Sequence, residues 1–390
     1  MNAANASAAV MWVGVTCYAL FGGADFGAGF WDLVAGRSER GHKQRRLIEH
    51  SIGPVWEANH VWLIFVLVVM WTAFPRLFGA VSSTLYIPLT IAALGVIARG
   101  SAFAFRKTVV SNWQRRTLGT VFAMSSIVTP FFLGSAAGAV ASGHVPPGNG
   151  TGPPVSSWWN PVSFVSGVLA VVVCAYLAAV YLTADARRTG DVALVYQFRN
   201  RALGAGVVAG TIAASGLVWL HRDANSLYQG LLHRGLSLVV VSALAGAAAL
   251  GFIYRRSFVL SRVAAAVAVT AVLWAWAVAQ YPKLLQPNLT VAGAAANHSV
   301  LVAMLVCLGA GAVLLVPSLA WLYSIAESGD PGYLGSKGPV VNKSTFGKRP
   351  VDPDHHQVLS EHEATPRWRI RNSSDAGCHE RQIGAIDRSQ

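Results

Sequence analysis

Long apolar stretches alternate with short polar loops over the first 326 residues of the chain. A helix needs about 20 mainly apolar residues to cross a membrane. Candidate spans of this kind cover residues 8–35, 52–74, 78–106, 117–142, 161–184, 202–220, 233–254, 258–281 and 299–325. The second is weakened by its polar start and the sixth by its short length, so a count of eight stays open. We predict an all-α integral membrane protein with about nine transmembrane helices, arranged as two four-helix bundles plus one peripheral helix.

The charge of the loops predicts how these helices are oriented. Loops after the first, third, fifth and seventh candidate spans hold 16 Lys and Arg residues, whereas loops on the opposite side hold 4. Because basic residues accumulate on the cytoplasmic side of membrane proteins, we predict the N-terminus outside and the C-terminus in the cytoplasm. Nine helices give this alternation without a break, which favours nine over eight.

Composition agrees with the hydropathy pattern and excludes two other classes of protein. Of the 390 residues, 54% are hydrophobic and 12% are charged, whereas soluble domains contain about 25% charged residues. The net charge of +13 comes from short basic clusters between apolar runs. This distribution is typical of cytoplasmic loops and not of a nucleic-acid-binding surface. We therefore expect a multi-pass protein surrounded by a lipid bilayer, with no nucleic-acid partner.

The residues after position 326 differ in composition from the rest. From 327 to 390 the chain is rich in Gly, Pro, Ser, His and mixed charge, which is typical of disorder. Its metal-ligating residue types do not match the spacing of a structural zinc site; they are His355, His356, His362, Cys378 and His379. The sequence thus predicts a transmembrane domain over 1–326, a disordered cytoplasmic tail over 327–390 and no metal site.

Three charged residues lie well inside the predicted spans: Asp25, Glu57 and Arg99. At 1.5 Å of rise per residue, all three lie roughly 8–15 Å from the cytoplasmic ends of their helices. An unpaired charge at the bilayer centre costs at least about 2.5 kcal/mol, so we expect the three to form one cluster. Two interpretations stay open. The cluster is a structural ion pair that joins three helices, or it belongs to a cytoplasmic proton path that also uses His60.

Two further features near the cluster have competing interpretations. His60 is a weak candidate for a haem ligand, because a lone intramembrane histidine is more often a hydrogen-bonded polar residue. Gly23 and Gly27 follow no predicted strand, so they do not indicate a dinucleotide-binding loop. Their small-xxx-small spacing predicts a packing face that lets a neighbouring helix approach Asp25 closely.

Three stretches of the sequence resemble one known family. The stretch ADFGAGFWDLVAGRSERGHKQRRLIEHSIGPVWEANHVWLIFVLVVMWTAFP resembles the N-terminal region of cytochrome bd ubiquinol oxidase subunit II. LYIPLTIAALGVIARGSAFAFR resembles the family's arginine-containing third-helix segment, and YPKLLQPNLT resembles the segment after its eighth helix. The resemblance is strong over residues 12–106 and continues more weakly to about residue 325.

The resemblance assigns expected roles to individual residues. Asp25 matches the aspartate of the family's first-helix segment, and Arg99 matches its third-helix arginine. Trp56 and Glu57 match its Trp–acid pair, and Asn59 matches its asparagine. In the family the acidic positions are implicated in proton uptake from the cytoplasm. Carried over, this implies a proton path or ion-pair cluster of Asp25, Glu57, Arg99 and His60, supported by Trp56 and Asn59.

The resemblance also implies a setting for the chain. It implies a non-haem subunit with no catalytic residues of its own, which supports assembly of a quinol-oxidising, oxygen-reducing enzyme in a bacterial inner (plasma) membrane. Haems b and d and the quinol site would belong to a partner, the haem-bearing subunit I. A contact of this chain with oxygen or a quinone is also implied.

Four positions depart from the family's pattern. An acid is usual a few residues before Asp25, where Gly22 and its neighbours stand, and another is usual at Ala104. Ala58 replaces a usual glycine, and His60 replaces a usual Glu or Gln. These changes put the family's proton path in doubt, or reroute it through His60.

Two rival functions stay open at this stage. A proton-coupled membrane transporter would use the same acid–arginine cluster, although the second half of the chain shows no equivalent intramembrane charges. A structural membrane subunit without a catalytic role would need only the ion pair.

Overall fold

The computed structural model describes residues 2–36, 38–53, 56–106, 108–109 and 111–328, apart from the side chains of 112, 323 and 326–328. Within these residues, nine helical segments are long and apolar enough to cross a membrane. They are Ala3–Val34, Trp56–Ala73, Tyr86–Arg106, Trp113–Ala141, Pro161–Arg188, Val192–Asp223, Leu236–Tyr254, Phe258–Gln280 and His298–Leu322. The all-α membrane fold and the helix count are thereby confirmed. The predicted tail from residue 329 on lies outside the described residues.

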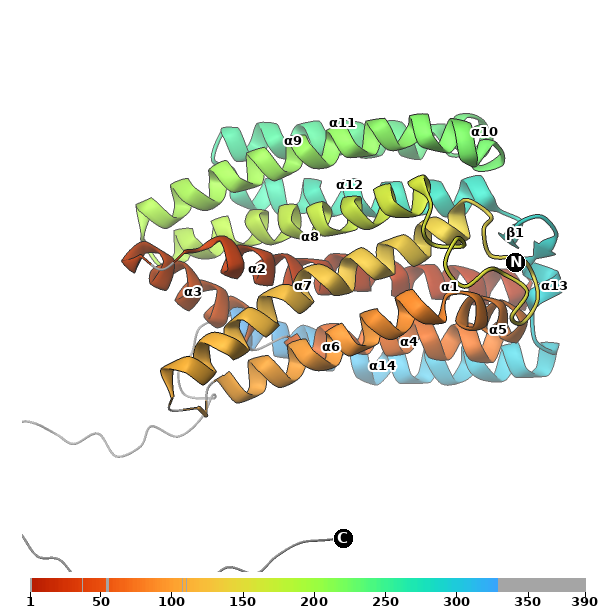
Figure 1. Ribbon diagram of the computed structural model, residues 1–390, viewed down its shortest axis with the longest axis horizontal. Coiled ribbons are helices and arrows are strands. Elements are labelled where there is room, and N and C mark those ends of the chain that lie inside the picture. The colour runs from red at the N-terminus through yellow and green to blue at the C-terminus, as the bar shows by residue number, and fades with distance from the viewer. Residues whose placement is uncertain (1, 37, 54–55, 107, 110, 329–390) are drawn as a thin grey trace, which may run out of the picture. The chain divides into compact units, whose positions relative to one another are not determined.

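Most of the chain is helical, and the helices lie side by side along the long axis of the described unit (Figure 1). The spanning helices are α1 (Ala3–Cys17) continued through a π-helical turn into α2 (Gly23–Val34), α4 (Trp56–Ala73), α6 (Tyr86–Arg106), α7 (Asn112–Ala141), α8 (Pro161–Arg188), α9 (Val192–Asp223), α11 (Leu236–Tyr254), α12 (Phe258–Gln280) and α14 (His298–Ser328). Shorter elements are α3 (Glu39–Ile52), α5 (Pro75–Thr84), α10 (Asn225–His233), α13 (Val291–Ala294) and the hairpin of β1 (Lys283–Leu285) and β2 (Leu289–Thr290).

Helix α3 occupies most of the basic segment that the hydropathy pattern predicts as a loop. Ser38 caps its N-terminus by accepting a hydrogen bond from the Gly41 amide, as N-terminal serines commonly do. Leu47, Ile48 and Ile52 are buried on one side of the helix. Ile48 and Ile52 recur at helical spacing. The segment is nevertheless too polar to be recognised as a membrane span, because four basic residues precede them: Arg40, Lys43, Arg45 and Arg46.

The first spanning segment changes its helical winding where it meets the site described below. Residues Tyr18–Gly22 form the π-helical turn between α1 and α2. Such turns widen a helix by one residue and occur often at functional sites. Here the turn places the Tyr18 ring against the ring of Phe26, with their centroids 6.3 Å apart.

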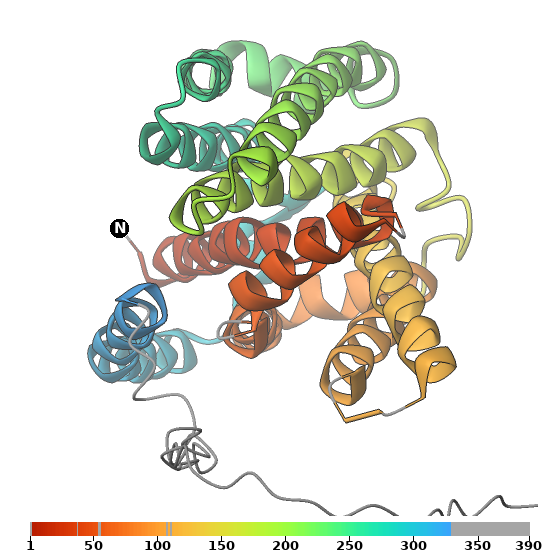
Figure 2. The same cartoon turned by 90° about the vertical axis from the view of Figure 1, so that its left-hand side faces the viewer.

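Helix α2 lies between the two groups of helices that the chain forms. It packs on α7 on one side and on α8 on the other. Helices α9, α11 and α12 gather on the α8 side, and α4, α6 and α14 lie on the opposite side (Figure 2). Because α2 packs on members of both groups, the division into two four-helix bundles stays a prediction, as does the orientation in the membrane.

Glycines on α2 permit this close packing. A Cβ atom at Gly27 would lie 1.8 Å from the carbonyl oxygen of Cys174 on α8, and one at Gly29 would lie 2.1 Å from the Ser126 hydroxyl on α7. Gly23 is less crowded, since its nearest neighbour would be the Cys174 sulfur at 3.5 Å. The small-residue face predicted from Gly23 and Gly27 is thus a contact with α8.

Substitution of Gly27 by alanine is expected to destabilise the protein, because the new methyl group would overlap the backbone of α8. Overpacking of this kind costs roughly 1–3 kcal/mol. Gly204→Ala on α9 is the matched control, because nothing lies within 4 Å of the added Cβ and alanine favours a helix. Thermal unfolding of the detergent-purified variants should show a lower midpoint for Gly27→Ala and an unchanged or higher one for Gly204→Ala. Equal midpoints would contradict the close approach of α2 and α8.

Candidate functional site

A buried ion pair joins Asp25 of α2 to Arg99 of α6. The two Nη atoms of Arg99 donate to the two carboxylate oxygens of Asp25, each at 2.9 Å, and Nη2 also donates to the Asp25 carbonyl oxygen at 3.0 Å. The side chains are 0% and 2% exposed for Arg99 and Asp25. This two-point geometry is the strongest form of charge-assisted hydrogen bond in proteins.

Helix α7 completes the surroundings of the guanidinium. Nε of Arg99 donates to the Ser126 hydroxyl at 2.9 Å, and this hydroxyl donates in turn to the Phe122 carbonyl at 2.6 Å. The guanidinium carbon lies 4.7 Å from the ring centre of Phe122 and 5.1 Å from that of Phe26. Cation–π contacts of this kind add to the ion pair when water is excluded. One arginine therefore holds α2, α6 and α7 together.

A second group of charges lies two turns further along the same two helices. Asp32 of α2 is buried, and its carboxylate pairs with Arg106 of α6 at 3.1 Å and with Arg45 of α3 at 3.0 Å. Arg106 also contacts the partly exposed Glu49 of α3 at 3.2 Å. Asp32 follows Asp25 by seven residues, and Arg106 follows Arg99 by seven, so the two pairs lie about 10 Å apart along the helices.

Glu57 does not join the buried pair. It lies in the first turn of α4 with an exposed side chain, and the described residues include no ion-pair partner for it. Its neighbours face inward instead. The Trp56 ring packs on the ring of Phe103 at 5.2 Å, and Asn59 is buried. The structure thus brings together Asp25 and Arg99 of the predicted cluster, and it places Glu57 on the outer face of α4.

His60 lies beside the pair but does not bond to it. Its ring centre is 5.8 Å from that of Phe26 and 6.4 Å from that of Tyr18. Both ring nitrogens of His60 and the hydroxyl of Tyr18 are buried, and none has a hydrogen-bond partner among the described residues. Phe26 therefore contacts both His60 and Arg99, and a small group of polar atoms lies next to the ion pair.

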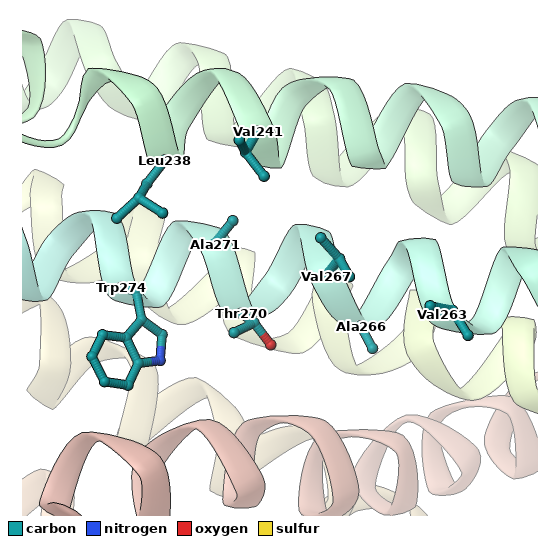
Figure 3. Close-up of a pocket in the computed structure, with 8 residues that line it drawn as sticks. All are labelled: Leu238, Val241, Val263, Ala266, Val267, Thr270, Ala271 and Trp274. Carbon is teal, nitrogen blue, oxygen red and sulfur yellow. The ribbon is translucent and has the colours of Figure 1, made fainter. Parts of the chain in front are cut away.

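An apolar groove lies between α11 and α12 (Figure 3). It has a volume of about 540 Å³ and is lined by Leu238, Val241, Val263, Ala266, Val267, Thr270, Ala271 and Trp274. The indole nitrogen of Trp274 donates to the Thr16 hydroxyl at 3.2 Å. The lining includes no acid, base or charged group, so the groove suits an apolar chain and not the chemistry of a proton-transfer site.

Sequence reasoning missed several residues of the site. Ser126 and Phe122 lie in a plain apolar span, and nothing in that span marks them as neighbours of Arg99. Asp32 and Arg106 lie near the ends of their spans in the sequence, where charged residues are common, yet a signal for their pairing exists. Each lies seven residues after a member of the Asp25–Arg99 pair, which puts the two pairs on the same faces of the same two helices.

Loss of Arg99 is expected to destabilise the protein strongly, because it leaves the Asp25 carboxylate buried without a partner. Breaking a buried pair in this way costs about 3–5 kcal/mol. Arg116→Gln is the control for Arg99→Gln. Arg116 is an exposed residue in the first turns of α7, at the end of the bundle where most loop Lys and Arg residues lie, here called the basic end. The amount of protein in the membrane and the midpoint temperature of unfolding in detergent should both fall sharply for Arg99→Gln and not for Arg116→Gln. If both variants behave like the wild type, the pair does not hold these helices together.

Comparisons with known proteins identify relatives along most of the chain. The family model described as cytochrome bd terminal oxidase subunit II matches residues 4–326. Cytochrome bd ubiquinol oxidase subunit 2 of Bacillus subtilis is 31% identical over 185 residues, 47% of this chain and 52% of that protein. Cytochrome bd-I ubiquinol oxidase subunit 2 of Escherichia coli is 27% identical over 126 residues, 32% of each chain.

A solved structure gives the same result at the level of the fold. A chain in the structure of bd oxidase from Geobacillus thermodenitrificans superposes with a TM-score of 0.70 at 25% identity, covering 85% of this chain and 100% of that one. The sequence matches to the curated relatives are shorter than this structural match. The chain spans about half the length of the Bacillus subtilis cytochrome bd ubiquinol oxidase subunit 2. Since the family match runs from the first spanning helix to the last, this chain belongs to the cytochrome bd terminal oxidase subunit II family.

Proposed function

We propose that this chain is the non-haem subunit of a cytochrome bd-type quinol:oxygen oxidoreductase in a bacterial plasma membrane. In this proposal it assembles with a haem-bearing subunit I, which holds haems b and d and oxidises the quinol. The chain itself contributes assembly contacts and a route for protons from the cytoplasm. The family membership and the nine apolar helices support the proposal.

The observation that carries the proton route is the pair of charge layers on α2 and α6. The first layer, around Asp32, reaches the partly exposed Glu49 through Arg106. The second layer is the Asp25–Arg99 pair, two turns deeper, with His60 and Tyr18 beside it. Carboxylates and a histidine placed in series within a membrane are the groups that relay protons in other proteins. From the basic end of the bundle inward, the acidic groups follow in the order Glu49, Asp32 and Asp25.

Among the described residues, the second half of the chain offers no comparable arrangement for a transporter. Arg262 of α12 pairs there with Asp185 of α8, and both side chains are 24% exposed, near the basic helix ends. A purely structural subunit shares the buried pair of Asp25 and Arg99. The two hypotheses differ in their predictions: for a purely structural subunit, replacing titratable residues should not change the turnover rate of the complex.

Copurification tests whether the chain has a haem-bearing partner. Expressed with its genomic neighbours and purified through a tag on this chain, the complex should show a reduced-minus-oxidised haem spectrum. His60→Gln should leave that spectrum unchanged, because both imidazole nitrogens, the atoms that would bind iron, are buried beside Phe26 and Tyr18. Absence of haem with every copurified partner would remove the oxidase proposal. A changed spectrum in His60→Gln would make His60 a haem ligand.

Glu57 lies outside the two charge layers, so its part in proton uptake needs a test of its own. Glu57 is next to the inward-facing Trp56, whereas Glu39 lies in the first turn of α3, and both are exposed. If Glu57 collects protons for the complex, Glu57→Gln should lower quinol-dependent oxygen consumption by about tenfold or more, and Glu39→Gln should not. The assay is oxygen uptake by the purified complex, normalised to haem. Equal rates in the two variants would remove the special role of Glu57.

A further inference from the structure

A second cavity lies at the basic end of the bundle, far along the chain from the Asp25–Arg99 site. It has a volume of about 350 Å³ and is built by the last turn of α8, the first two turns of α9 and the connection between α11 and α12. Six of its lining residues determine its character: Arg187, Arg199 and Arg256, with Val192, Val195 and Phe258. Three guanidinium groups and an apolar wall therefore share one cavity.

The three arginines are not neutralised by acids. None of them forms an ion pair within the described residues. Arg187 lies over the Phe258 ring at 5.9 Å, and Arg199 donates to the carbonyl oxygens of Ile253 at 3.1 Å and Tyr254 at 2.9 Å. These contacts fix the positions of two guanidiniums while leaving their charge uncompensated.

The two nearest acids along the chain are already engaged elsewhere. Asp185 pairs with Arg262. Asp191 accepts from the amides of Ala193 and Leu194 at the start of α9 and lies 3.8 Å from Lys43. The cavity therefore keeps a net positive charge.

The backbone around Arg256 supports a binding function. Arg256 has a φ of +62°, a left-handed conformation that glycine and asparagine adopt far more readily. A strained residue of this kind is a reason to look for function. Arg256 lines the cavity, just before the N-terminus of α12. Ser257, which precedes that helix, makes no side-chain cap, so the first amides of α12 add further positive potential.

We propose that this cavity binds the phosphate group of an anionic membrane phospholipid. Planar guanidiniums bind phosphate with two parallel hydrogen bonds, which explains three arginines in one cavity. Basic pockets at the ends of spanning helices on the cytoplasmic side are typical sites for anionic lipid headgroups. Close in sequence to the lining residues Arg256 and Phe258, two large side chains are exposed: Val259 at 73% and Tyr254 at 71%. An acyl chain can pack against such an apolar surface, whereas a soluble phosphate compound has no apolar chain to bury there.

The lipid site can be tested on the full chain, purified with its copurifying partners in detergent. Native mass spectrometry would titrate dioleoylphosphatidylglycerol against dioleoylphosphatidylcholine as the zwitterionic reference. Arg187→Gln combined with Arg256→Asn removes two guanidiniums, and asparagine retains the left-handed backbone. The matched control is Arg255→Gln combined with Arg116→Gln, which removes the same charge at exposed positions that do not line the cavity.

The wild type should bind phosphatidylglycerol selectively, and the cavity variant should bind it roughly 25-fold more weakly, at about fivefold per arginine. The control should lose about twofold or less, since its residues lie outside the cavity. Equal losses in the two variants would overturn the site. Displacement of the bound lipid by inorganic phosphate would overturn the lipid assignment in favour of a soluble anion.

A charge-conserving variant keeps the test decisive if the neutral one does not fold. Arg187→Lys with Arg256→Lys retains both charges but loses the planar two-point geometry, so its affinity for phosphatidylglycerol should fall by about fivefold. Unchanged affinity in this variant, with wild-type thermal stability, would contradict a phosphate held by guanidinium groups.

Discussion

The buried pair of Asp25 and Arg99 is the interaction on which the arrangement of the first half of the chain depends. A guanidinium and a carboxylate each lose several kcal/mol of hydration when they are buried. The structure offsets this loss with four hydrogen bonds from Arg99, three to Asp25 and one to Ser126, and with two aromatic rings. The buried charges are stabilised only when residues of all three helices are in place, so α2, α6 and α7 are held in one relative position.

The packing of α2 follows from the same requirement. Asp25 can reach Arg99 only if α2 sits deep between its neighbours, and the glycines at 27 and 29 allow that depth against α8 and α7. The second charge layer, around Asp32, repeats the pairing of α2 with α6 two turns closer to the basic end and adds α3 through Arg45. A ladder of two ion pairs thus fixes both the spacing and the rotation of these helices. A series of titratable groups for proton transfer would use this same scaffold.

The sequence predicted those features that depend on helix length and depth. The spans could be found because membrane thickness fixes their length, and Asp25 and Arg99 could be matched because both lie at similar depth. Hydropathy does not reveal helix α3, because its apolar residues Leu47, Ile48 and Ile52 follow a run of basic ones. Amphipathic helices lie below the threshold of a hydropathy window.

The side of a helix on which a residue lies was harder to predict from the sequence than its depth. Each residue turns by about 100°, so Glu57 points away from the face that carries Trp56, Asn59 and His60, although its depth matches that of the ion pair. The serine and phenylalanine of α7 that surround Arg99 could not be predicted, since their proximity arises only from the tertiary packing of three helices.

The central claim is that the interaction between Asp25 and Arg99, and not either residue alone, holds α2, α6 and α7 together. A double-mutant cycle with Asp25→Asn and Arg99→Gln measures this interaction directly, with the free energy of unfolding determined for the wild type, both single variants and the double variant. We predict a coupling free energy of about 2–3 kcal/mol, with the double variant more stable than the sum of the single losses allows. Additive losses, with a coupling near zero, would contradict the account.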